Sequence, residues 1–187
     1  IVADDGSEKD CFDLVEQFFK EKNFANYKLV KNPVNQGIVK NVLSAVNVAQ
    51  GKYIKLISPG DFLYDENTLH EFVDFAEKNP ADAYFCNAIY YSVNFEKKIL
   101  KIYTDKKNPK FLEPFHTGNL KKIRRNYFMR NDFICGATMF METNIVQEYL
   151  NKISEYSKYT EDLFYMYMVS ENRKLCHINR NCIFYEY

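Results

Sequence analysis

Strand-like and helix-like segments alternate through the first 92 residues, and this order restricts the fold more than any other feature of the chain. Apolar and aromatic runs typical of strands occur at residues 1–3, 27–30, 53–57 and 83–91. Between them, apolar residues recur every three or four positions, as in amphipathic helices. They are Phe12, Val15 and Phe19; Ile38, Val42, Ala45, Val46 and Ala49; and Leu69, Phe72, Val73 and Ala76. The order predicts an α/β fold: a three-layer, mostly parallel sheet with helices on both faces.

The second half of the chain has a less regular pattern. We expect a strand at 99–103 that pairs with the preceding strand, a loop at 104–119 and a short strand that ends at 142. Two helices should follow, one at 143–152 capped by Thr143 and one from 161 to about 171 capped by Thr160. The chain should end in two closing strands, at 175–178 and 183–187. The length of 187 residues predicts one domain. Its regular and irregular parts suggest a cofactor-type half, about 1–92, and a substrate half, about 93–187.

Charge and hydropathy exclude several classes of protein. The 25 Lys and Arg residues balance 25 Asp and Glu residues, which argues against nucleic acid as a partner. No apolar run approaches the roughly 20 residues of a membrane span, and the start does not read as a signal peptide. The chain opens at Ile1, partway through a strand and without Met, so we expect further residues before it in the native protein.

The chain has five cysteines, an odd number, and its sequence contains no Cys-x-x-Cys pair. Both observations favour free thiols in a reducing cytoplasm over a set of disulfides. Cys176, His177 and Cys182 are the closest group. A metal site there is disfavoured, because neighbouring residues on a strand point to opposite faces.

Polar turns follow the first three expected strands. Because the carboxyl ends of parallel strands meet at one rim of a sheet, these turns should gather where such folds bind ligands. In the first turn, Asp4 and Asp5 can accept hydrogen bonds from ring N–H groups or sugar hydroxyls, and Gly6 permits a tight bend. The alternative is that Asp5 or Ser7 only caps the next helix.

The second and third turns offer an anion site and a cation site. Gly37 precedes a helix whose first turn carries Lys40, and a helix N-terminus beside an ammonium favours phosphate. A solvated lysine is the alternative. Asp61 follows the strand at 53–57 and could hold Mg²⁺ or Mn²⁺ together with substrate phosphates. The alternative is an ordinary Pro-Gly turn.

Glu161 and Asp162 open a later expected helix. The helix dipole alone favours acids there, but one of them could also act as a general base toward a hydroxyl. Tyr159, Phe164 and Tyr165 could stack on sugar faces, although core packing is the preferred reading for each.

In their order and spacing, these motifs resemble the family 2 glycosyltransferases. The resemblance is close over residues 1–65 and resumes at 135–141 and 160–165. It implies a glycosyltransferase A fold that binds a nucleotide sugar in its first half, places acceptor and catalytic groups in its second, and inverts the anomeric carbon. It also implies that a strand precedes Ile1, in agreement with a truncated start.

The resemblance assigns roles to particular residues. Asp5 would contact the base, commonly uracil, Lys40 would lie near the diphosphate, and Asp162 would activate the acceptor hydroxyl with Glu161 beside it. The nucleotide-sugar-binding set is Asp4, Asp5, Gly6, Ser7, Asn35, Gly37, Lys40, Asn41, Ser58, Gly60 and Asp61.

One motif departs from the family pattern. The family usually has Asp-x-Asp-Asp where this chain has Ser58-Pro59-Gly60-Asp61, and the Gly60 position is often a metal ligand. Asp61 is then the remaining metal ligand. Either a divalent cation is held by fewer protein groups, or cations such as Lys40 do more of the charge neutralisation.

The function implied is hexosyl transfer from a nucleoside-diphosphate sugar, commonly a UDP-sugar, to a hydroxyl of a glycan or lipid-linked acceptor in cytoplasmic synthesis of surface polysaccharide. A non-catalytic binding module of the same fold is the alternative. A nucleotidyltransferase ranks lower, because the start of the chain has no glycine-rich signature of that class.

A basic cluster is either a solvated helix face or a contact with anionic lipid or a lipid-linked phosphate. It contains Lys121, Lys122, Arg124, Arg125 and Arg130.

Overall fold

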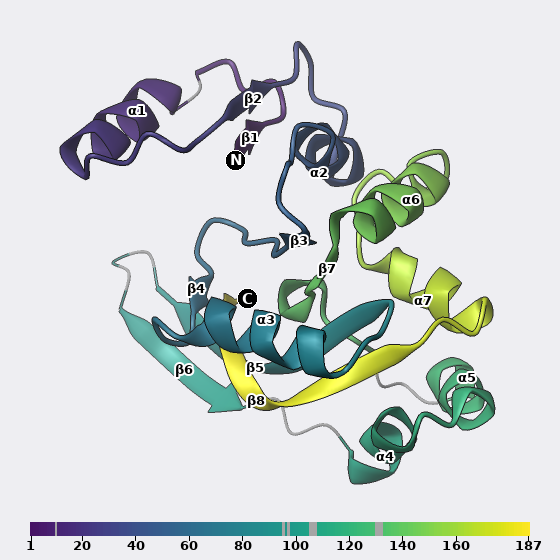
Figure 1. The fold of residues 1–187 in the computed structure, drawn as a ribbon. Helices are drawn as coiled ribbons and strands as arrows, with labels where there is room; N and C mark the ends of the chain where they lie inside the picture. Colours follow the sequence, from purple (N-terminus) through teal and green to yellow (C-terminus); the bar gives the residue numbers. More distant parts are fainter. Residues whose placement is uncertain (10, 95, 97, 105–107, 130–132) are drawn as a thin grey trace.

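The strands of the computed structural model form separate ladders (Figure 1). The structure describes residues 1–9, 11–94, 96, 98–104, 108–129 and 133–187. Within these residues, β1 (Val2–Asp4) pairs in parallel with β2 (Leu29–Lys31), and β3 (Tyr53–Ile54) pairs antiparallel with β7 (Met141–Glu142). The largest sheet has the order β4 (Phe62–Leu63), β8 (Leu175–Glu186), β5 (Ala83–Val93) and β6 (Ile99–Thr104). Its central pair, β5 and β8, is parallel, and its outer pairs are antiparallel.

Strand β5 divides the core into two layers. Successive side chains of a strand point to opposite faces, so Ala83 and Phe85 enter one apolar cluster while Tyr84 and Cys86 enter the other. Helix α3 (Thr68–Lys78) covers the second cluster, where its Phe72 stacks on Phe140 at 4.8 Å between ring centroids.

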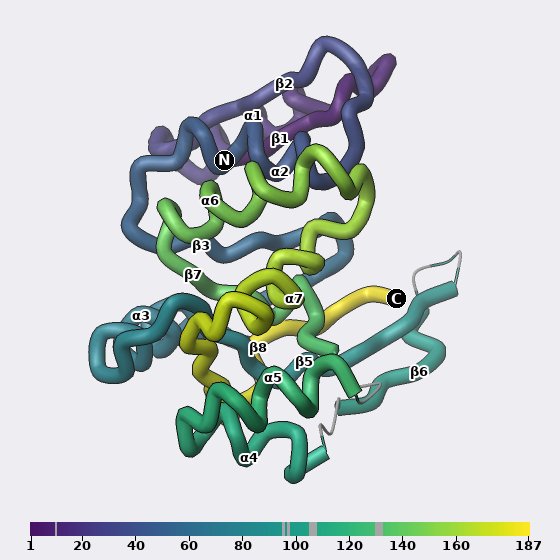
Figure 2. The backbone as a smooth tube through the Cα atoms, turned by 90° about the vertical axis from the view of Figure 1, so that its right-hand side faces the viewer, coloured from purple at the N-terminus to yellow at the C-terminus, as the bar shows by residue number. Residues whose placement is uncertain are grey.

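The first cluster is larger and is covered by several helices (Figure 2). They are α2 (Ile38–Val46), α4 (Pro109–Thr117), α5 (Leu120–Met129), α6 (Thr143–Ile153) and α7 (Leu163–Ser170). Fully buried Tyr149, Phe164 and Tyr165 contribute to it. For Phe164 and Tyr165 the preferred reading, core packing, is confirmed.

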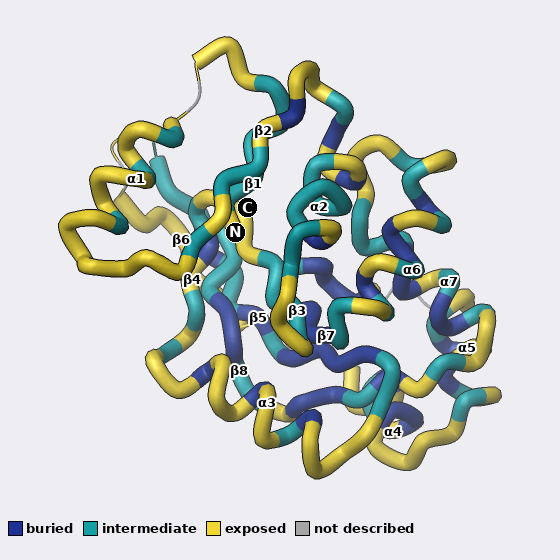
Figure 3. Tube along the Cα trace, turned by 45° about the horizontal axis from the view of Figure 1, so that its top comes forward, coloured by how far each residue is buried: buried dark blue, intermediate teal, exposed yellow. Residues whose placement is uncertain are grey.

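The N-terminal layer stands apart from this core. Helix α1 (Phe12–Glu21) buries none of its ten residues, and Figure 3 shows most of it as exposed. Figures 1 and 2 place β1 and β2 on one side of the β3–β7 pair and the large sheet on the other. A cavity of about 520 Å³ lies between Ile1 and Tyr27 on one side and Tyr53 to Leu56 on the other. The expected α/β class is confirmed, although the strands do not form one continuous sheet among the described residues.

Residues 104–119 are not the expected loop, because α4 lies within them. Asn108 caps this helix by accepting a hydrogen bond from the Lys110 amide at 2.9 Å, Pro109 occupies its first turn, and Gly118 ends it with φ +66°. Pro114 inside the helix disguised the helical pattern.

Two cap assignments are also wrong. Thr143 is the first residue of α6 rather than its cap, and its hydroxyl donates to the Gly51 carbonyl at 2.6 Å. Helix α7 begins at Leu163, with Asp162 rather than Thr160 at the cap position. The two expected closing strands are one strand, β8, with shifts in its register against β5.

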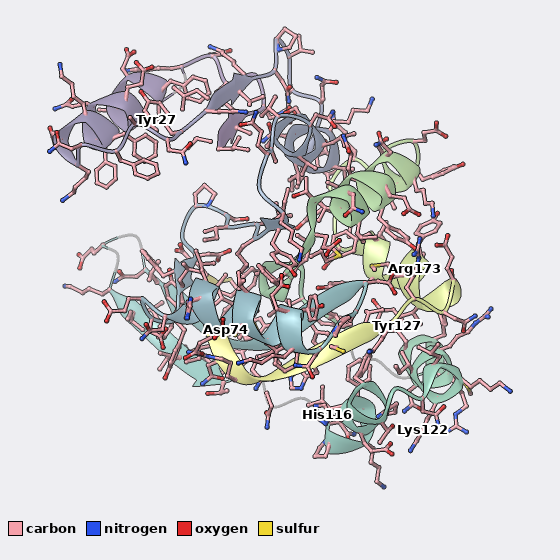
Figure 4. All side chains as sticks on the ribbon, viewed as in Figure 1. Tyr27, Asp74, His116, Lys122, Tyr127 and Arg173 are labelled. Atoms are coloured by element: carbon pink, nitrogen blue, oxygen red, sulfur yellow. The ribbon has the colours of Figure 1, made fainter. Side chains whose placement is uncertain are left out.

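The five cysteines are free thiols. His177 is buried and hydrogen-bonds Asn87 at 2.9 Å and His116 at 3.0 Å, and Figure 4 labels His116 on α4. Nowhere in the described part of the chain is a helix both long and apolar enough to cross a bilayer.

Candidate functional site

Two adjoining cavities bring most of the expected site residues together. The first, of about 490 Å³, we call the loop cavity; Asp5, Asn35, Gly37, Asn41 and Ser58 are among its lining residues. The second, of about 380 Å³, we call the acidic cavity; Ser58, Asp61, Glu161 and Asp162 are among its lining residues. Ile38, Leu56, Ser58 and Tyr159 line both. A ligand can therefore extend from one cavity into the other.

Asp5 holds the loop that forms one wall of the loop cavity. Its Oδ1 accepts hydrogen bonds from the Asn32 side chain and the Gln36 amide, each at 3.0 Å, and its Oδ2 accepts one from the Gly37 amide at 2.6 Å. Burial alone would raise the pKa of Asp5, but these hydrogen bonds and the charge of Lys158 together lower it. Asp5 is thus an ionised anchor of residues 32–37, and it does not cap α1, whose cap position is Cys11.

Asp4, Gly6 and Ser7, the rest of the first turn, do not belong to the described lining of either cavity. The Asp4 carboxylate accepts a hydrogen bond from the Ser7 amide at 2.9 Å. Gly6 has φ +73°, and a Cβ there would lie 2.5 Å from the backbone of Val34. Because both the angle and the contact exclude a side chain, Gly6 lets this turn pack against residues 34–35.

The segment before α7 lies against the start of α2. The Val39 amide donates to the Lys158 carbonyl at 3.2 Å, and a Cβ on Gly37, whose φ is +92°, would collide with Lys158. Next to it, Tyr159 lines both cavities and is 63 % exposed, so it differs from the packed Phe164 and Tyr165. Lys40 is exposed on α2 and does not belong to the described lining of either cavity.

Glu161 and Asp162 line the acidic cavity beside a close backbone approach. A Cβ on Gly136 would lie 3.1 Å from both the Asp162 Cβ and a Glu161 carboxylate oxygen, and the Gly136 amide donates to Asp162. Burial raises the pKa of both carboxyls, and hydrogen bonding offsets only part of the rise. The motif analysis did not include Gly136, since only the folded chain brings it to these acids.

Asp61 lines the acidic cavity next to Ser58, which lines both cavities, and is only 8 % exposed. Its carboxylate accepts hydrogen bonds from the Glu186 amide at 3.2 Å and the Ser58 amide at 3.4 Å. Burial raises the pKa of Asp61, although these amides and nearby Lys55 oppose the rise. Residues 58–61 also form the ordinary Pro-Gly turn that was the alternative to a cation site, because the Asp61 amide donates to the Ser58 carbonyl at 3.0 Å.

The combined lining of the cavities is acidic. Its described residues include the carboxylates of Asp5, Asp61, Glu161 and Asp162 but a single ammonium, that of Lys55. Lys55 donates to the carbonyls of Leu56 at 2.7 Å and Ala137 at 2.5 Å, and burial lowers its pKa. An anionic ligand placed here would need additional positive charge. No group of three or more His, Cys, Asp or Glu residues suited to a metal occurs in the described part of the chain.

The basic cluster lies on α5, away from these cavities. Lys121, Arg124 and Arg125 are exposed, and Lys122 (labelled in Figure 4) forms an ion pair with Glu113. Arg130 lies outside the described residues. Phe128 and Met129 at the end of the helix are 50 % and 80 % exposed, so apolar side chains adjoin the charged ones.

Comparison with known proteins gives a family match and a fold match. The family model for glycosyl transferase family 2 matches residues 1–150. Among solved structures, S. aureus TarS 1-349 superimposes with a TM-score of 0.61 at 18 % identity, over 97 % of this chain and 49 % of that one. The same TarS fragment in complex with UDP-GlcNAc gives 0.59 at 15 % identity, over 98 % and 48 %. The chain thus spans about half of these proteins, and at such identities the likeness concerns the fold alone. Curated proteins yield no significant match.

Proposed function

The chain belongs to glycosyl transferase family 2, whose model matches 150 of its 187 residues, and from this premise we propose that it transfers a sugar from a UDP-sugar to a hydroxyl group with inversion at the anomeric carbon. The acceptor we propose is a glycan or lipid-linked glycan in the cytoplasmic synthesis of surface polysaccharide. The observation that supports this best is the contiguity of the loop cavity with a second cavity lined by Glu161 and Asp162.

The loop cavity is proposed to take the nucleoside diphosphate. Asp5 fixes its wall and, as a carboxylate, keeps lone pairs that can accept a further hydrogen bond from a base N–H. At the start of α2 the Gly37 and Val39 amides donate to Asp5 and to the Lys158 carbonyl, so phosphate is proposed to meet the amides of Ile38 and Lys40. That a TarS fragment has been crystallised with UDP-GlcNAc supports a uridine nucleotide as the first one to test.

The acidic cavity is proposed to take the donor sugar and the acceptor hydroxyl. Asp162 accepts the hydroxyl proton, the acceptor oxygen bonds to the anomeric carbon, and the bond from that carbon to the diphosphate oxygen breaks on the opposite face. Burial raises the pKa of Asp162, which makes its carboxylate a stronger base than an exposed aspartate. Glu161, beside it, is proposed to orient the acceptor.

A divalent cation suits the groups near the junction of the cavities. Asp61 offers carboxylate oxygens, the ligands that Mg²⁺ and Mn²⁺ prefer, and Mg²⁺ sites with phosphate ligands often use only one or two protein carboxylates. The fit is limited by Ser58 and Gly60, which supply no carboxylate. When bound, the ion would neutralise charge on the departing diphosphate. Asp61 is the residue that we assign to it here.

Calorimetric titration with UDP, GDP and dTDP tests the nucleotide assignment. We expect UDP to bind and GDP to bind at least about tenfold more weakly, because guanine presents unmatched hydrogen-bonding groups to a site that hydrogen-bonds uracil. Thymine presents the same hydrogen-bonding groups as uracil, so dTDP tests only the added methyl group and the missing 2′-hydroxyl. Tighter binding of GDP or dTDP would overturn the uridine assignment. An Asn35→Ala variant, which alters a lining residue, should weaken UDP binding, whereas Asn151→Ala, an exposed position of α6 outside the described lining of both cavities, serves as the matched control.

A non-catalytic binding module remains the second candidate, and the loss of two carboxylates from the 58–61 turn favours it. Nucleotide binding is common to both candidates. They differ in chemistry: an enzyme transfers the sugar or hydrolyses the donor, and a module does neither.

The basic cluster is proposed to contact anionic lipid, which would hold the protein at a membrane surface near a lipid-linked acceptor. A variant with Lys121→Gln, Arg124→Gln and Arg125→Gln should bind phosphatidylserine vesicles roughly 100-fold more weakly, at about 1 kcal/mol for each basic residue. Vesicle flotation at low and high salt measures this. The matched control changes Lys20, Lys22 and Lys78, which are exposed elsewhere. Equal binding by the two triple variants would contradict the proposal.

A further inference from the structure

The last residue of β8, Glu186, lies over the 58–61 turn. In this turn Ser58 and Gly60 stand where the family pattern has carboxylates. We propose that Glu186 joins Asp61 as a second protein carboxylate for a divalent cation that binds the donor diphosphate. The inference rests on the proposed function, since it concerns how the same site meets the charge of its substrate.

The backbone of β8 brings Glu186 to Asp61. Strand β8 runs parallel to β5, with Glu186 opposite Tyr91 in the register, and the Tyr187 amide donates to the Tyr91 carbonyl at 3.1 Å. The Glu186 amide donates to the Asp61 Oδ1 at 3.2 Å. Tyr91 in turn donates from its hydroxyl to the Gly60 carbonyl. One hydrogen bond therefore joins the 58–61 turn directly to the end of β8, and the other two join them through Tyr91 of β5.

The side chain of Glu186 fills the space that a side chain at position 60 would need. A Cβ on Gly60 would overlap a carboxylate oxygen of Glu186 and would lie 3.1 Å from the Glu186 Cδ. Gly60 also has φ +98°, a conformation that disfavours other residues. A carboxylate thus occupies the place left by the missing Gly60 side chain, although it comes from another strand.

The charges around this carboxylate favour a bound cation. The Glu186 amide donates to the Asp61 carboxylate and the Glu186 side chain lies over Gly60, so two carboxylates meet at one turn. Lys55 is the ammonium among the described lining residues, and it donates to two backbone carbonyls. A diphosphate would add further negative charge, so a divalent cation between it and the two carboxylates would relieve the repulsion.

A Glu186→Gln variant tests the proposal, because glutamine keeps the size of the side chain and removes its charge. The readout is the ratio of UDP affinities with and without Mn²⁺, measured by calorimetry, together with Mn²⁺ binding followed by electron paramagnetic resonance. We expect Mn²⁺ to raise the affinity of the wild type for UDP and the ratio to fall at least about tenfold in Glu186→Gln, since loss of even an indirect metal partner costs roughly 10- to 100-fold.

Two further variants make the result specific. Asp61→Asn should reduce the ratio as Glu186→Gln does, while Glu155→Gln, which neutralises an exposed carboxylate beyond α6, should retain the wild-type ratio. An undiminished ratio in Glu186→Gln with a wild-type melting temperature would overturn the inference. If the wild type binds UDP equally well with and without Mn²⁺, this inference fails and the proposed function stands. If it binds no nucleotide at all, the proposed function itself fails.

Discussion

An Asp162→Asn variant is expected to lose about 10²- to 10⁴-fold in the rate of sugar transfer, the usual contribution of a positioned general base. Asparagine keeps the shape of the side chain but cannot take the proton of the acceptor hydroxyl. Asp162 lies in the acidic cavity, where it accepts a hydrogen bond from the Gly136 amide. UDP affinity should change little, because the nucleotide is proposed to occupy the neighbouring loop cavity.

The dependence of the rate on pH provides a second readout of the same group. Burial raises the pKa of Asp162 and of Glu161 from the ordinary values of these carboxyl groups. A protonated base is inactive, so the rate should rise with pH through a value above about 3.9, the pKa of an unperturbed aspartate. The residual activity of Asp162→Asn should lack this limb of the profile.

The controls separate three outcomes. Asp74→Asn on α3, labelled in Figure 4, removes an exposed carboxylate outside both cavities and should keep the wild-type rate. If Glu161→Gln loses the rate and Asp162→Asn does not, the base is Glu161. If the wild type neither transfers the sugar nor hydrolyses the donor over a screen of UDP-sugars, the non-catalytic module is the better description.

The parts of the site that could be predicted from the sequence are those built by local chemistry. Asp5, Gly37 and Asp61 each belong to a turn that follows an apolar run, and the rule that such turns meet at one rim placed them correctly along the two cavities. Glu161 and Asp162 were identified by resemblance rather than by pattern, since two acids at a helix start are common.

The remaining parts depend on contacts between segments far apart in the chain. Glu186 lies 125 residues from Asp61, and only the parallel pairing of β8 with β5 brings them together. Lys55 stands at an ordinary strand position, and its enclosure by the Ala137 carbonyl follows from the packing of residues 136–138. A pattern of local periodicity contains no information about such pairs.

An Asp5→Ala variant is expected to lower the free energy of unfolding by about 1–3 kcal/mol, because the amides of Gln36 and Gly37 and the side chain of Asn32 lose their shared acceptor. UDP affinity should fall at least about tenfold, since the wall of the loop cavity would no longer be fixed. Urea denaturation followed by circular dichroism measures the first effect, and calorimetry measures the second. Asp4→Ala is the matched control: it removes a neighbouring carboxylate that accepts from the Ser7 amide, and it should leave residues 32–37 in place.

The effect of Asp5→Ala on stability should itself depend on pH. The folded chain lowers the pKa of Asp5, through hydrogen bonds and the charge of Lys158 that outweigh burial, so the ionised carboxylate is bound more favourably in the folded state. This stabilisation is fully present above the unfolded pKa of about 3.9 and is lost as the pH falls through the lower folded value. The difference in unfolding free energy between wild type and Asp5→Ala should therefore be constant from pH 7 to about pH 5 and shrink toward pH 3. A difference that stays constant down to pH 3 would show that the side chain, and not its charge, holds the loop.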